Sequence, residues 1–122
     1  MSAKCLDADV LTRIRQQRSE TFLLRLIDLF LEDGPMRIQQ AWDGGAAKDL
    51  RKVALSAHIL RCLADNIGAV SIRDLAAAAE VAAMGGKGAA LFLAHILFDL
   101  EIAFAETRSC LLAAKQGMAE NP

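Results

Sequence analysis

Apolar residues recur every three or four positions along most of this chain, which is the spacing of one face of an α-helix. The clearest stretch is residues 57–69, the second half of a helix in which one stripe carries Val53, Ala57, Leu60, Ala64 and Ile67. Gly68 follows directly, and a glycine just after a helix is a common stop signal. The pattern therefore predicts an amphipathic helix that buries one face and ends at Gly68.

The same periodicity predicts four long helices in all, this one included, and one short helix, with caps and glycine pairs at their ends. The expected ranges are a short helix carrying Val10, Leu11 and Ile14, and long helices over about 19–43, 46–66, 71–84 and 88–115. A kink or a break is expected at Gly34-Pro35, because proline removes a backbone donor and crowds the preceding turn. Short connections make neighbouring helices antiparallel. The fold class is predicted to be all-α, an up-down antiparallel four-helix bundle with a short extra N-terminal helix.

Composition agrees with this fold class. The chain has 122 residues, of which 54% are hydrophobic, with only 2 prolines and 8 glycines. This length predicts one domain over residues 1–122, with its core over about 8–114. The three cysteines, Cys5, Cys62 and Cys110, do not resemble a disulfide framework, and no signal peptide is visible, so a cytoplasmic location is predicted.

The net charge argues against nucleic-acid binding, and the hydropathy pattern argues against a membrane span. The formal charge is −1, from 14 basic and 15 acidic residues, so nothing indicates a nucleic-acid surface. The longest apolar run, 89–98, is too short to span a bilayer and contains His95. No binding to nucleic acid or to membranes is predicted.

The candidate chemistry lies on the polar side of the helix that ends at Gly68. His58 is opposite the apolar stripe, and its neighbours there are Arg51, Ala54, Arg61, Cys62 and Asp65. Arg61 is at i+3 from His58, a spacing that brings side chains together on a helix surface. An exposed imidazole near a fixed guanidinium suits phosphoryl chemistry, because the ring can attack while the cation holds phosphoryl oxygens.

These residues resemble the signature of histidine-containing phosphotransfer (HPt) domains. The family usually has His-x-Leu-Lys-Gly, then small residues and Asn-Ile-Gly or Asn-Leu-Gly. Ala57-His58-Ile59-Leu60 and Asn66-Ile67-Gly68-Ala69 match this pattern with the right spacing. Arg61 replaces the usual lysine, Cys62 the usual glycine, and Leu63 is bulkier than usual. Glu80, in the next helix, is at a position where the family often has an acidic residue.

The resemblance implies a phosphocarrier without autonomous catalysis. His58 would accept a phosphoryl group from the aspartyl phosphate of a receiver domain and pass it to another receiver, with Arg61 and Cys62 in contact with the phosphoryl group or the partner. A docking surface is expected at Arg51, Ala54, Leu55, Ile59 and Asp65. For Leu55 and Ile59, packing against a neighbouring helix is an equal alternative. Asn66 and Gly68 are expected to be structural.

The resemblance also implies the partners and the absence of a cofactor. Partners would be response-regulator receivers or a hybrid sensor histidine kinase, and magnesium would belong to the receiver. No metal site is predicted on this chain, since His58 and Cys62 form a pair at i, i+4 without an evident third ligand.

Two other functions remain as alternatives. The departures at Cys62 and Leu63 allow a degenerate module that docks receivers or kinases without phosphotransfer. A structural oligomerisation domain would explain the high share of hydrophobic residues. Leu91, Phe98 and Ile102 form a second apolar stripe, for which the short N-terminal helix or a second copy in a homodimer is a candidate cover.

Overall fold

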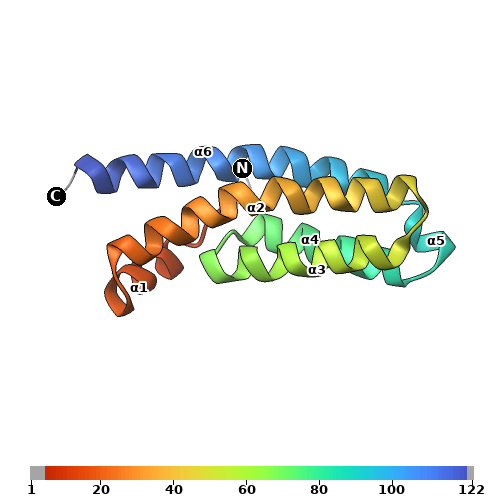
Figure 1. Cartoon of the computed structure of the whole chain (residues 1–122), viewed down its shortest axis with the longest axis horizontal. Coiled ribbons are helices and arrows are strands. Elements are labelled where there is room, and N and C mark those ends of the chain that lie inside the picture. Colours follow the sequence, from red (N-terminus) through yellow and green to blue (C-terminus); the bar gives the residue numbers. More distant parts are fainter. Residues whose placement is uncertain (1–4, 121–122) are drawn as a thin grey trace.

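The structure, a computed structural model, describes the backbone of residues 5–120 and the side chains of all of these except 87, 89 and 120. Every secondary-structure element within that range is a helix, and Figure 1 shows the helices in order along the chain. Their bounds are α1 Ala8–Gln17, α2 Glu20–Ala46, α3 Leu50–Ile67, α4 Val70–Met84, α5 Lys87–Ala90 and α6 Leu93–Glu120.

The four long helices form a closed bundle. Helix α2 packs against α3 and α6, and α4 packs against the same two helices. Their connections are short, so the chain runs up and down in turn, as the alternating directions in Figure 1 show. The predicted antiparallel four-helix bundle with a short N-terminal helix is confirmed.

The predicted apolar stripes form the core of this bundle. The five stripe residues of α3 are all buried, and Leu23, Ile27 and Phe30 of α2 are buried opposite them. On α4 the buried face is mostly alanine, at positions 76, 79, 82 and 83. Small side chains let helix axes approach closely, so α4 lies tightly against α3.

Local sequence fixes both ends of α3. The carboxylate of Asp49 accepts a hydrogen bond from the backbone N–H of Lys52, which caps the first turn. At the other end Gly68 adopts φ +76°, the left-handed conformation that favours glycine. A Cβ there would come within 2.8 Å of Val10 Cβ, because the N-terminal segment crosses the turn and the N–H of Asp7 donates to the Gly68 carbonyl at 2.8 Å.

Several of the predicted helix boundaries are wrong. Helix α2 runs through Gly34-Pro35 to Ala46 without a break, so α3 begins at Leu50 and not near residue 46. The chain reverses between these helices at Lys48, where φ is +57°. The last helix is divided into the single turn α5 and the long α6, which extends to Glu120.

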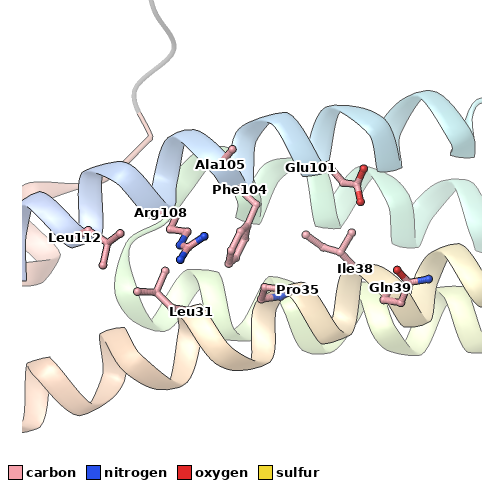
Figure 2. A pocket seen from close by; sticks show the side chains of 9 residues that line it. All are labelled: Leu31, Pro35, Ile38, Gln39, Glu101, Phe104, Ala105, Arg108 and Leu112. Atoms are coloured by element: carbon pink, nitrogen blue, oxygen red, sulfur yellow. The ribbon is translucent and has the colours of Figure 1, made fainter.

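The Gly34-Pro35 pair has a packing role within α2. Pro35 is exposed, whereas Gly34 is buried under the ring of Phe104 from α6, which also stacks on Phe30 with ring centroids 5.3 Å apart. Figure 2 shows Phe104 pointing from α6 toward α2, beside Pro35, in an open groove of about 420 Å³. The pair marks a close helix contact, in which Gly34 lies under the Phe104 ring and the neighbouring Pro35 is exposed.

The short helix α1 does not cover the second apolar stripe. It packs against α2, and its Ala8 and Leu11 lie near Gly117 and Met118 in the last turns of α6. Leu91, Phe98 and Ile102 remain 79%, 59% and 49% exposed. The N-terminal helix was therefore the wrong candidate cover, and the second copy stays a prediction. Among the described residues, no helix is long and apolar enough to cross a membrane.

Replacing Gly34 by alanine tests the contact between α2 and α6. The new Cβ would lie 2.4 Å from Cε2 of Phe104, so the ring must move. We expect Gly34→Ala to lower the free energy of unfolding by about 1–2 kcal/mol, after allowing for the better helix propensity of alanine. Urea denaturation followed by circular dichroism measures this.

Gly117→Ala is the matched control, because Gly117 is in α6 with nothing within 4 Å of its Cβ position. It should raise the free energy of unfolding by about 0.5–1 kcal/mol. A Gly34→Ala protein as stable as the Gly117→Ala protein would contradict this account of the contact.

Candidate functional site

Helix α3 presents His58 on its outer face. The core stripe on the other side of the helix fixes its rotation, so the residues between stripe positions must face away from the bundle. The side chain of His58 is 46% exposed. The ring is thus open to solvent on one side and in contact with neighbouring side chains on the other.

Glu80 of α4 lies beside the His58 ring. Its Oε2 is 3.0 Å from His58 Nδ1, and its Oε1 accepts a hydrogen bond from Arg61 Nε at 3.2 Å. The carboxylate is only 21% exposed, while His58 and Arg61 are more open. Glu80 therefore bridges the imidazole and the guanidinium with one oxygen each.

Arg61 makes a second close approach to the same ring nitrogen. Its Nη2 is 2.9 Å from His58 Nδ1. A ring nitrogen cannot accept from Arg61 and donate to Glu80 at once, so only one of these two contacts is a hydrogen bond in a given tautomer.

The protonated Nδ1 is the consistent assignment. The carboxylate oxygen at 3.0 Å needs a donor, and an unprotonated Nδ1 would turn two lone pairs toward each other. Arg61 keeps its hydrogen bond to Glu80 through Nε, and Nη2 then lies near Nδ1 without a hydrogen bond to it. In this tautomer the lone pair of the ring is on Nε2.

Cys62 is the neighbour of Nε2. Its Sγ is 3.7 Å from that nitrogen, and the thiol is exposed and not in a disulfide. The helical spacing i, i+4 from His58 explains the contact. Among the described residues, the only side chain in polar contact with Nε2 is thus the one that stands where the HPt pattern has glycine.

The residues expected in a docking surface have different exposures. Arg51, Leu55 and Asp65 are exposed, Leu55 at 62%. Ala54 and Ile59 are half-buried. For Leu55 this exposure favours the apolar rim over packing against a neighbouring helix, because nothing covers most of its side chain.

The end of α3 is tied to the start of α4. Asp65 is 3.9 Å from Arg73, a long ion pair between exposed side chains that contributes little to stability. Asn66 is exposed, and Gly68 is buried in the turn. Asn66 and Gly68 thus lie about two turns or more beyond His58, away from its ring.

Sequence reasoning placed an acidic residue at Glu80 but gave it no role. The available signal was the turn at Gly68: His58 is ten residues before it and Glu80 twelve after it. In an antiparallel helix pair with a short turn, residues at similar distances from the turn lie side by side. Which face of α4 meets α3 was the missing information.

No metal centre accompanies this cluster. Among the residues that the structure describes, no group of three or more His, Cys, Asp or Glu side chains could hold a metal ion. His58 and Cys62 remain a pair, so we describe the cluster by its imidazole, guanidinium, thiol and carboxylate.

Comparison with known proteins supports the fold. No protein-family model matches the chain, and no curated protein matches it. Among solved structures, it is similar to the crystal structure of histidine-containing phosphotransfer protein B from Pseudomonas aeruginosa PAO1. The TM-score is 0.79 at 23% sequence identity, and the match covers 94% of this chain and 97% of the other. This chain therefore has the fold of a histidine phosphotransfer protein.

The tautomer of His58 can be measured. We expect nitrogen-15 spectra of the neutral ring to show the proton mainly on Nδ1, because Glu80 accepts from it. Glu80→Ala should move the proton toward Nε2, since Arg61 then becomes the best partner of Nδ1.

Asp74→Ala is the control, because Asp74 is another carboxylate on α4 that pairs with Arg73 and not with His58. This variant should leave the ring spectrum unchanged. A wild-type ring with its proton on Nε2 would reverse the assignment.

Proposed function

We propose that this chain is a histidine phosphotransfer protein of a multistep two-component phosphorelay. His58 accepts a phosphoryl group from the aspartyl phosphate of one receiver domain and passes it to another. The observation that carries the proposal is the exposed His58 ring, held at Nδ1 by Glu80. The fold shared with a histidine-containing phosphotransfer protein supports it.

In the proposed transfer, His58 is the nucleophile. The lone pair of Nε2 attacks the phosphorus of the acyl phosphate, a P–N bond forms, the P–O bond breaks, and the aspartate leaves as a carboxylate. Nδ1 keeps its proton, so the ring becomes positively charged while Glu80 Oε2 is 3.0 Å away. A carboxylate already in place stabilises that developing charge without rearrangement, and no proton has to move.

Arg61 has the role of a mobile cation. In the free protein its Nη2 is beside Nδ1 and its Nε is bonded to Glu80. When a phosphoryl group is on Nε2, the guanidinium can turn toward the phosphoryl oxygens and keep its bond through Nε. A guanidinium offers several donors in a fixed fork, which matches phosphoryl oxygens better than an ammonium group does.

The partner supplies the remaining chemistry in this proposal. Receiver domains, free or within a hybrid sensor kinase, bring the aspartyl phosphate and a magnesium ion, and this chain has no cofactor of its own. The docking surface surrounds His58 with Arg51, Ala54, Leu55, Ile59 and Asp65. Apolar contact at Leu55 with charged residues around it is the composition of a transient interface.

One observation favours a second candidate function. The thiol of Cys62 is 3.7 Å from Nε2, where an incoming phosphoryl group must approach. A chain in which this side chain blocks the approach would dock receivers or kinases without accepting phosphate. The same assay separates the two functions, because only a phosphocarrier becomes labelled.

The first test is labelling by a phosphorylated receiver. We expect wild type to gain an acid-labile, base-stable phosphoryl group, and His58→Gln to fall to background, because an amide cannot attack. His95→Gln is the matched control, since His95 is the other histidine and is also exposed. Label that survives in His58→Gln would eliminate His58 as the acceptor.

The second test removes the thiol beside Nε2. We expect Cys62→Ala to speed transfer about 3- to 10-fold, which corresponds to about 1 kcal/mol for a side chain that no longer has to be displaced. Cys62→Gly should do the same with a lower melting temperature, because glycine weakens a helix interior. Binding of a receiver without label in wild type and both variants would favour the docking module. Equal rates would show that the thiol does not hinder transfer.

A further inference from the structure

A second pair of reactive side chains lies outside the His58 cluster. Cys5, before α1, and Cys110, on α6, have their sulfur atoms 2.8 Å apart. They are 105 positions apart in the chain, so only the fold brings them together. Both are thiols that form no disulfide, and both have intermediate exposure.

The contact is close to what a disulfide needs. Two sulfur atoms at 2.8 Å must approach by only about 0.8 Å to reach the length of an S–S bond. Cys5 is outside the helices, three residues before α1, so a shift of its sulfur need not move a helix. The hydrogen bond with Cys5, together with partial burial and the nearby charge of Glu106, raises the pKa of the Cys110 thiol. At neutral pH Cys110 is therefore mainly protonated, which keeps its share of the attacking thiolate form low.

A disulfide at this place would secure a segment that has few buried contacts. Helix α1 has no fully buried residue. It is fastened by the hydrogen bond from Asp7 to Gly68 and by partial packing of Leu11 and Ile14 on the core. Segments with so few buried contacts open at low free energy.

We propose that Cys5 and Cys110 form a reversible intramolecular disulfide that clamps the N-terminal segment and α1 onto α6. The oxidant is a low-molecular-weight disulfide such as oxidised glutathione. One protein thiolate attacks it and forms a mixed disulfide, releasing one glutathione thiol. The second protein thiolate then attacks the protein sulfur and releases the other. Two protein thiols are oxidised to one disulfide, one glutathione disulfide is reduced to two glutathione thiols, and these two thiols carry the two protons.

The consequence is a change in local and global stability. The bond closes a loop of about one hundred residues, for which loss of unfolded-chain entropy is large. The N–H of Asp7 donates to the carbonyl of Gly68 in the turn after α3, and Cys5 is only two residues before Asp7. The disulfide would therefore connect α6 to that turn. The disulfide involves residues that the proposed phosphotransfer does not use. The disulfide and the phosphotransfer can therefore be refuted independently.

The first experiment maps the bond. The full chain is equilibrated with oxidised and reduced glutathione at stepped ratios, free thiols are alkylated, and tryptic peptides are identified by mass. We expect residues 5–13 to be linked to residues 109–115, in a share that rises with the ratio and returns to zero with dithiothreitol. Links that involve Cys62, or Cys5 and Cys110 found only alkylated or joined to glutathione, would overturn the proposal.

The second experiment measures the clamp. Oxidised wild type should melt about 10 °C above the reduced protein, and amide exchange in α1 should slow. Cys5→Ser and Cys110→Ser are matched controls, each expected to melt near reduced wild type under both conditions. A linked protein whose melting temperature and α1 exchange do not change would refute the clamp.

Discussion

The close packing of α3 on α4 is the contact on which the rest of this structure depends. Alanine faces let the two helices approach, and Gly68 allows the chain to reverse between them in a left-handed turn. Together they set the register of one helix against the other. That register places Glu80 beside His58, so a buried hydrophobic contact determines the geometry of an exposed polar cluster.

The residues of the polar cluster differ in their exposure and in the contacts that they make. Glu80 is the least exposed member and bonds both neighbours, so it is the fixed point of the group. His58 and Arg61 are more open, and Arg61 and Glu80 both approach Nδ1 of the ring, where only one of them can be hydrogen-bonded in a given tautomer. Cys62 is on the opposite ring nitrogen. A ring held on one side and exposed on the other is what the proposed carrier role requires, and in that proposal the thiol controls access to Nε2.

The turn at Gly68 also connects the cluster to the N-terminal segment. Asp7 bonds to the Gly68 carbonyl, and Val10 lies against the place where a Cβ would be. Two residues earlier, Cys5 reaches Cys110 of α6. The N-terminal segment thus joins the last helix to the end of α3, although α1 itself buries no residue completely.

The sequence by itself determined the fold class and the side of α3 on which His58 lies. Period-3.6 stripes specify which face of each helix is buried, and they were correct from Val53 to Ile67 because burial of apolar area dominates that choice. Local rules were less reliable at Gly34-Pro35, where α2 is continuous although it contains a proline, and Gly34 is in close contact with the Phe104 ring. Relations between helices were decided only by the tertiary structure. The bond of Glu80 to His58 and the contact of Cys5 with Cys110 depend on register and rotation between elements, and periodicity within one helix contains no information on either.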